Sequence, residues 1–447
     1  MTIGSESLKA GIAGKPRGWM EECVVRYSNA RIWQGIPGLL AVAMTMAVPA
    51  QAHDDALAND WQPVAAAPGG HADIADLQAQ LVQFPDSAAV RRRLLNAYLE
   101  AERPVEALNE AAELARRGYA FSPAAQALLL SLEPTPAQRE AFGLQTANGV
   151  PIEASRLLAE VPADVRLVES VWRDPKSGDL FATSVVSRAL HVRRGEGDWA
   201  QVPLEGAGSL SGIAVDPGSG LLWVGSGVFD QTPDPATAFR GVIAIDPRSG
   251  EEKRRIAAPE GGSPSDLAVG GDGTIYASDP VSGAVYLGRP GAERLETLIA
   301  PGTFRSPQGI AELPGTSRIV VSDYGYGLAL VDVATGAVSR VATDTGFLVD
   351  GIDGIWLHGD RLIGVQNGAR PMRIVELRLS PDGTRAVAAS ALERAHPAWT
   401  EPVGGNLSNG ELVYVATGQW DRFGDGGAVA GDRPPVPTEI RALPLAP

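Results

Sequence analysis

The sequence predicts a mainly β protein, a six-bladed β-propeller preceded by a small α-helical segment. After Pro162 a helical period gives way to short alternating strands separated by turn clusters. One strand-and-turn unit then recurs six times, and the residues that open successive units are 42, 54, 43, 45 and 48 positions apart. A period of about 40–50 residues built only from strands is typical of propeller blades.

The amino-acid composition excludes several classes of protein. The chain has 447 residues, of which 44% are hydrophobic, enough for a large core. Its formal net charge is −15 and it has no Lys/Arg-rich tract, so we expect no nucleic-acid partner. A single cysteine excludes both a disulfide scaffold and a multi-thiolate metal site.

The N-terminal segment predicts export. Arg26 and Arg31 precede an apolar run, Ile36–Pro49, which ends at a small-x-small site. We therefore expect residues 1–52 to be a bacterial signal peptide and the mature protein to be periplasmic or secreted, without a membrane anchor. A transmembrane anchor is the alternative, but the run is shorter than the ~20 residues needed to cross a bilayer. The basic region is long, so Met20 is a second candidate start.

A helical segment follows. Residues 53–71 are polar and rich in Ala and Pro, and we expect a flexible lead-in. Apolar residues then recur at three- and four-residue steps through 72–145. The helix pair predicted at 87–101 and 104–117 resembles a tetratricopeptide repeat. The residues at that repeat's interlocking positions are Leu94, Tyr98, Ala107 and Ala111, while its aromatic opening position is Arg91.

Two interpretations of the helical segment remain open. One repeat cannot form a binding groove, since such units need stacked neighbours to bury their faces. The segment is therefore either a cap packed on the next domain or a module that docks a protein partner.

We expect the propeller to span 151–447, with Pro151–Val161 and Thr438–Leu445 sharing one blade and so closing the ring. The innermost strand of each blade starts near the central channel, which brings one leading side chain per blade to a common axis. The six leading residues, all polar, are Glu169, Ser211, Ser265, Gln308, Asp353 and Glu401. Crowded carboxylates resist ionisation unless a cation neutralises them. Oxygen ligands favour a hard divalent ion, calcium ahead of magnesium.

Across about 165–447 the chain resembles the senescence-marker-protein/gluconolactonase family of propellers, related to strictosidine-synthase-like proteins. The family's first-blade Glu-Gly-Pro-x-Trp is matched by Glu169-Ser170-Val171-Trp172, and its fifth-blade Asp-Gly by Asp353-Gly354. Asn367-Gly368 follows as the family's Asn-Gly does, and Asp350-Gly351 is a second candidate for the Asp-Gly match. The resemblance implies calcium binding and hydrolysis of sugar lactones.

The resemblance also assigns roles. Glu169, Gln308 and Asp353 would hold the cation, with Gln308 standing where the family has a ligand Asn. Ser265 stands where the family has a substrate-binding Asn, directly before Asp266. Both replacements alter reach or hydrogen bonding. The predicted substrate-binding residues are Ser211, Ser265 and Asp266.

The predicted mechanism is metal-assisted lactone or ester hydrolysis. Asp353 would accept a proton from the attacking water, with Glu401 as the second candidate base. No Gly-x-Ser-x-Gly elbow occurs and no His beside a Ser is recognisable, so we expect no serine-hydrolase chemistry.

Two alternative functions stay open, as does the structure of one insertion. The chain could be a non-catalytic propeller that binds a ligand or, through a helical docking cap, a protein. A strictosidine-synthase-like condensation enzyme is a weaker alternative. The insertion Gln419–Pro437, with Trp420 and Phe423, either covers the channel mouth or is a disordered loop.

Overall fold

The computed structural model describes Trp61 and residues 73–343 and 346–446; the predicted signal peptide and the rest of the lead-in lie outside them. The described part begins with five helices. They are α3 (Ile74–Gln83), α4 (Ala88–Glu100), α5 (Pro104–Arg116), α6 (Pro123–Ser131) and α7 (Pro136–Asn148). The sequence sets their starts. Ser87, Ser122 and Thr135 each accept a backbone N–H of the following turn, and proline occupies the first position of α5, α6 and α7.

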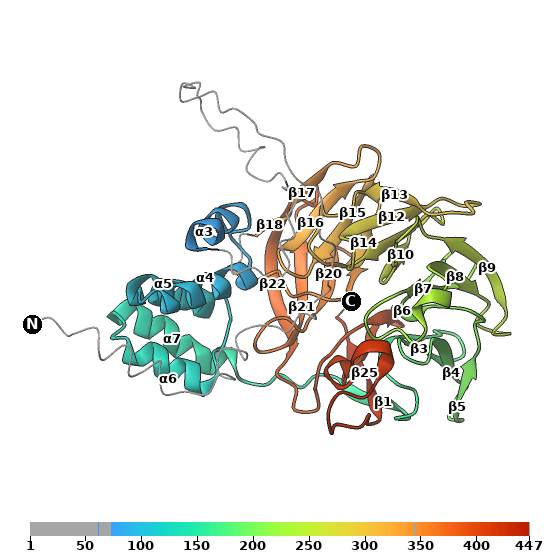
Figure 1. Ribbon diagram of the computed structural model, residues 1–447, viewed down its shortest axis with the longest axis horizontal. Coiled ribbons are helices and arrows are strands. Elements are labelled where there is room, and N and C mark those ends of the chain that lie inside the picture. Colours follow the sequence, from blue (N-terminus) through green and yellow to red (C-terminus); the bar gives the residue numbers. More distant parts are fainter. Residues whose placement is uncertain (1–60, 62–72, 344–345, 447) are drawn as a thin grey trace, which may run out of the picture.

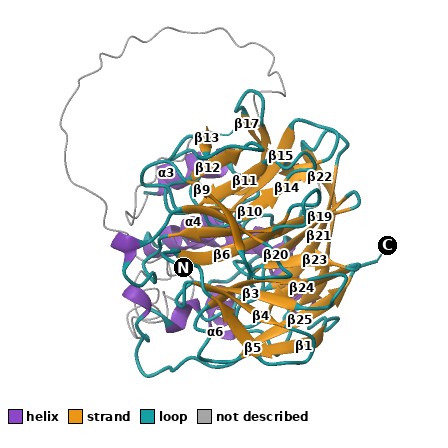
Figure 2. Cartoon of the chain, turned by 90° about the vertical axis from the view of Figure 1, so that its right-hand side faces the viewer, coloured by secondary structure: helices purple, strands orange, loops and turns teal. Residues whose placement is uncertain are grey.

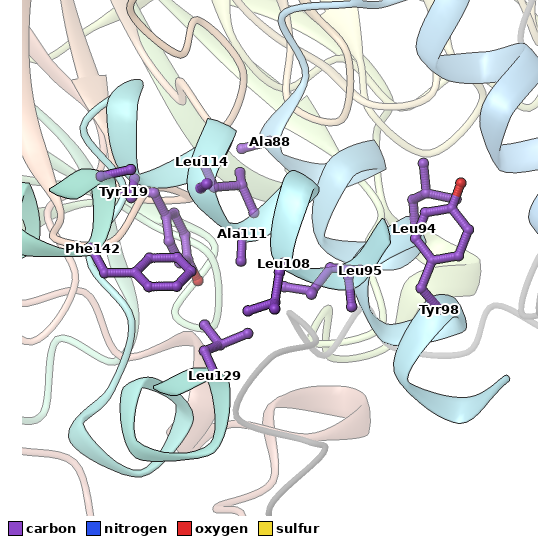
Figure 3. Close-up of a cluster of buried hydrophobic side chains, with 14 of the residues drawn as sticks. Ala88, Leu94, Leu95, Tyr98, Leu108, Ala111, Leu114, Tyr119, Leu129 and Phe142 are labelled. Carbon is purple, nitrogen blue, oxygen red and sulfur yellow. The ribbon is translucent and has the colours of Figure 1, made fainter. Parts of the chain in front are cut away.

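The helices share a core of small and branched side chains. Ala107, Ala111 and Leu114 on α5 are completely buried, because alanines let neighbouring helices approach closely. Phe142 of α7 packs into the same cluster, and Figure 3 shows its ring facing the α5 side chains. The predicted helical segment is thus a packed unit, and its resemblance to a tetratricopeptide repeat stays a prediction.

The rest of the chain forms six antiparallel sheets, which confirms the predicted six-bladed propeller. Blade 1 consists of β2 (Val168–Arg173), β3 (Leu180–Ser184), β4 (Ala189–Arg193) and β5 (Trp199–Val202). Blade 2 consists of β6 (Ser209–Val215), β7 (Leu222–Gly227), β8 (Gly241–Ile245) and β9 (Glu252–Ala257), with the short helix η2 (Pro235–Thr237) in its β7–β8 connection. Blade 3 consists of β10 (Leu267–Val269), β11 (Ile275–Asp279), β12 (Ala284–Gly288) and β13 (Glu296–Ile299).

The second half of the ring follows the same plan. Blade 4 consists of β14 (Pro307–Leu313), β15 (Arg318–Asp323), β16 (Gly327–Asp332) and β17 (Val338–Arg340). Blade 5 consists of β19 (Ile355–His358), β20 (Arg361–Gln366), β21 (Arg373–Leu379) and β22 (Arg385–Arg394), with β18 (Ala342–Thr343) added in parallel at its edge. Blade 6 consists of β23 (Gly405–Ser408), β24 (Glu411–Val415), β25 (Thr438–Pro444) and β1 (Arg156–Val161).

Blade 6 closes the ring with strands from both ends of the fold. β25 lies between β24 and β1, and Val161 pairs with Thr438. Ile440 and Ala442 of β25 are completely buried in one cluster with Val161. The shared blade expected from the sequence is therefore present, and it removes the free edges that an open ring would expose.

Two appendages cover the same end of the propeller. Because the strands of a blade alternate in direction, the turn between its second and third strands lies at the end where the innermost strand begins, as does the connection to the next blade. The helical unit docks on such segments of blades 4 and 5: Ser87 Oγ donates to Gly325 O at 2.8 Å, and Ala120 N donates to Arg370 O at 2.7 Å. Figure 1 shows the helices gathered on one side of the propeller, beside β18, β21 and β22, and in Figure 2, which views the molecule from the side opposite the helices, they lie behind the strands.

The insertion in blade 6 lies at the same end, over blades 1 and 2. It contains the short helices η3 (Trp420–Arg422) and η4 (Asp425–Gly427). Phe423 is 3% exposed and packs with Leu167 and Val186, while Gly426 N donates to Asp230 O at 2.7 Å. Of the two alternatives for this segment, packing over the propeller therefore holds. Within the described residues no helix is long and apolar enough to span a bilayer.

Candidate functional site

Glycines let the starts of the innermost strands approach one another around the axis. In alternate blades a glycine N–H donates to the carbonyl of the leading residue of the next blade. The three bonds are Gly212 N to Ser265 O (3.2 Å), Gly309 N to Asp353 O (2.8 Å) and Gly404 N to Glu169 O (3.0 Å). A Cβ on Gly309 would stand 2.4 Å from Ile355 N, so only glycine fits there. The polar-Gly pairs of the sequence thus hold the leading residues close to the axis.

Four carboxyl groups from four blades influence one another at this axis. They belong to Glu169, Asp266, Asp353 and Glu401. Burial raises the pKa of all four, to about 7 for Asp266 and Glu401 and to about 6 for Asp353, while that of Glu169 rises well above its usual range. The negative charge of Asp353 further raises the pKa of the other three. In the described part of the chain no cationic side chain contributes to these shifts.

Asp353 is the most firmly positioned of the four. Asn367, which follows β20, donates from Nδ2 to Asp353 Oδ2 at 2.9 Å and to Pro402 O at 2.9 Å. Tyr324 in turn donates its hydroxyl to Asn367 Oδ1 at 2.8 Å. The Asn367 bond lowers the pKa of Asp353 against the effect of burial, so Asp353 ionises most readily of the four.

Glu169 is held differently. Its Oε2 accepts the indole N–H of Trp420 at 2.6 Å, a residue 251 positions later in the blade 6 insertion. Trp420 packs edge-on against Phe229 of blade 2, with ring centroids 6.3 Å apart. The sequence singled out Trp420 only as part of a loop, because nothing local links it to Glu169.

The predicted substrate-binding residues have other contacts. Ser211 is 2% exposed and its hydroxyl donates to Ser265 O at 3.0 Å, which ties blade 2 to blade 3. In blade 3 the carboxyl group at the axis comes from Asp266, one position after the leading Ser265. The amide nitrogen of Gln308, a predicted ligand, donates to Ser306 Oγ at 3.0 Å.

The second candidate for the Asp-Gly match has a different role. Asp350 Oδ2 accepts the N–H of Ala89 at 2.8 Å and so caps α4 of the helical unit. Asp353 is the residue of this loop that belongs to the axial cluster.

The oxygens at the axis are the donor set that a divalent cation would use. Four crowded carboxyl groups without a cationic partner are oxygen donors of the type that calcium prefers. As placed, however, no group of three or more His, Cys, Asp or Glu side chains among the described residues could hold a metal ion. Glu169 Oε2 accepts the Trp420 indole N–H in this arrangement. The chemistry of the donors fits a cation, and their positions would have to converge on it.

One expectation from the sequence is wrong. Ser187 Oγ lies 2.9 Å from His191 Nε2, so a serine does stand beside a histidine. The turn between β3 and β4 brings them together across four positions, a spacing that does not resemble a known nucleophile motif.

Comparisons with known proteins give distant structural likenesses only. No known family model matches the chain, and no curated protein matches its sequence. A gluconolactonase from Xanthomonas campestris is 17% identical, with 66% of this chain and 100% of that chain covered and a TM-score of 0.43. The PQQ-bound aldose sugar dehydrogenase from Streptomyces coelicolor gives 17% identity, 66% and 99% coverage, and a TM-score of 0.43. Virginiamycin B lyase from Staphylococcus aureus is 14% identical, with 62% of this chain and 80% of that chain covered and a TM-score of 0.41.

The chain is therefore a six-bladed β-propeller protein with an N-terminal helical unit. Gluconolactonase-like and sugar dehydrogenase propellers are among its structural neighbours, at low identity. These likenesses concern the fold alone.

Proposed function

We propose that the protein is an exported, divalent-metal-dependent hydrolase of lactones or related cyclic esters, with its reaction centre at the propeller axis. The observation that carries the proposal is the axial group of four carboxyl groups, in which Asp353 alone is locked in place by an amide donor. A cluster of like charges without counter-charge costs stability, so its presence favours a ligand that neutralises it.

Asp353 is the general base of the proposed reaction. With Oδ2 fixed by Asn367, its other oxygen accepts a proton from water as that water attacks the ester carbonyl carbon. The ring C–O bond then breaks, and the leaving alkoxide takes a proton, which gives the free hydroxy acid. Glu401, whose pKa burial raises to about 7, is partly protonated near neutral pH and can supply it. It is also the second candidate base.

The proposed cation, calcium foremost, would be held by oxygens of Glu169, Asp353 and Gln308. When bound it would neutralise the cluster and polarise the ester carbonyl. Trp420 limits Glu169 to its Oε1 atom unless the indole moves. Ser211 and Ser265 would serve substrate binding mainly through the strand starts that they position.

A lactone panel tests this proposal. The mature chain from residue 53 should hydrolyse small sugar lactones in the presence of calcium, and Asp353→Asn should lower kcat by at least about 100-fold. Asp332→Asn, in an exposed turn of blade 4, is the matched control and should leave the rate unchanged. Activity that is insensitive both to a chelator and to Asp353→Asn would refute the proposal.

Export has its own test. Expressed with its full N-terminus in a bacterial host, the chain should appear in the periplasmic or secreted fraction with a new N-terminus at His53. Retention of the uncleaved chain in the cytoplasm would contradict the predicted signal peptide.

A further inference from the structure

The pair Ser187 and His191 lies outside the axial cluster. Ser187 is in the turn between β3 and β4 of blade 1, and the next residue, Arg188, has a left-handed φ of 54°. This turn brings Ser187 Oγ to 2.9 Å from His191 Nε2 on β4. His191 is 6% exposed, and burial lowers the pKa of its imidazole, although the nearby charge of Asp164 opposes this. A neutral imidazole in contact with a hydroxyl is the arrangement of a nucleophile and its base.

The surroundings of Ser187 make it accessible. It is half-buried and lines an open depression together with Arg188, Gln201, Leu204 and Ala207. Arg188 is fixed there, because Nε donates to Ala207 O at 2.7 Å and Nη1 donates to Pro233 O at 2.8 Å. The depression therefore presents a hydroxyl and an immobilised positive charge on adjacent residues.

We propose that Ser187 and His191 form a second hydrolytic site, for acyclic carboxylic esters, with Ser187 as nucleophile, His191 as general base and Arg188 as the group that attracts an anionic acyl portion. His191 Nε2 takes the proton of Ser187 Oγ as this oxygen bonds to the acyl carbon. The ester C–O bond breaks and the alkoxide leaves with that proton as an alcohol. Water, deprotonated by His191, then cleaves the acyl-serine to release the carboxylic acid and restore Ser187. Asp164 stabilises the imidazolium formed in each step.

Neither step needs a metal or Asp353, so this site is distinguishable from the axial one. The experiment uses the mature chain, a fluorophosphonate probe and mono-p-nitrophenyl succinate, all in excess chelator. We expect the probe to label Ser187, as located by peptide mass spectrometry. We expect Ser187→Ala to abolish hydrolysis of the ester, and His191→Asn to slow both labelling and hydrolysis at least 10-fold. Asp332→Asn, at the end of β16 and away from both sites, should leave both reactions unchanged.

Controls separate a chemical role from a structural one. Ser177→Ala, in an exposed turn of the same blade, should behave as the unsubstituted chain. Arg188→Lys keeps the charge but loses the forked donor pair, and it should raise KM for the anionic ester more than for p-nitrophenyl acetate. Labelling of the unsubstituted chain tests the proposal even where a variant fails to fold. If Ser187 stays unlabelled between pH 6 and 9, the pair is only a hydrogen bond that stabilises the hairpin, and the proposal is overturned.

Discussion

The helical unit and the blade 6 insertion cover the same end of the propeller, but they are attached by different chemistry. At the helical unit, Asp86 forms ion pairs with Arg117 and with Arg340, each at 2.8 Å, and all three side chains are at most 17% exposed. The insertion's own ion pair, Asp421 with Arg433, has side chains 62% and 56% exposed.

The helical unit is thus held by buried ion pairs, whereas the ion pair of the insertion is exposed. Besides its ion pairs, the helical unit contacts blade 5 at the start of α4, where the Ala89 N–H donates to Asp350 Oδ2. The insertion touches the axial cluster at Trp420, whose indole donates to Glu169 and whose backbone bonds to Glu401. We infer that the helical unit holds the loop before Asp353 rigidly, whereas the insertion is the side from which a ligand can gain access to Glu169.

The largest expected effect on stability concerns the helical unit. Asp86→Ala removes a buried carboxylate that Arg117 and Arg340 share, although Arg117 keeps its ion pair with Glu113, and should lower the free energy of unfolding by roughly 3 kcal/mol. The matched substitution in the insertion, Asp421→Ala, should cost less than about 0.5 kcal/mol, because that pair is exposed. Urea denaturation measures the free energy of unfolding of both variants. Equal losses would contradict the inferred difference between the helical unit and the insertion.

The second expectation concerns pH in the absence of metal. The folded-state pKa values of Asp266 and Glu401 are raised, so the unfolded chain releases these protons at lower pH than the folded chain. Their contribution to stability is therefore complete below about pH 4 and is lost as the pH rises through about 7. At about 1.4 kcal/mol per pKa unit, we expect the Glu401 part of this contribution to fall by roughly 3 kcal/mol between pH 4 and 8. Comparing the unsubstituted chain with Glu401→Gln by denaturation at several pH values isolates that part, and identical pH dependences would contradict it.

A smaller effect is expected for the cap of α4. Asp350→Ala removes the acceptor of the Ala89 N–H and should cost about 1 kcal/mol. Amide hydrogen exchange should become faster at the start of α4 and stay unchanged at 420–423. Faster exchange in both segments would mean that the two appendages are coupled.

A small effect on stability, below about 1 kcal/mol, is expected for Trp420→Phe, since an aromatic ring stays and only the donor is lost. That donor lowers the pKa of Glu169, so the substitution should raise this pKa further. Infrared titration of the carboxyl bands checks the shift, with Trp399→Phe in blade 6 as a control. An unchanged band would mean that the indole does not bond to Glu169 in solution.

The sequence predicted the propeller because each blade repeats one local pattern, and six copies of a weak signal add up. It also located the leading residues, since the Gly that follows several of them is required by close packing at the axis. The sequence could not show that Asp266, and not the leading Ser265, is the residue that blade 3 contributes to the axial cluster. A one-residue shift at a strand start leaves the sequence pattern unchanged. The partnership of Trp420 with Glu169 depends on tertiary packing across 251 positions and leaves no local signal.

The closure of blade 6 has a consequence for how this protein is made. β25 is the partner of both β24 and β1, and it follows all the other described strands of the propeller along the chain. Until it arrives, both partners present bare backbone that another nascent chain could pair with. A version ending at residue 437 should therefore accumulate as intertwined or aggregated species, and adding back a peptide of residues 438–446 should rescue the monomer.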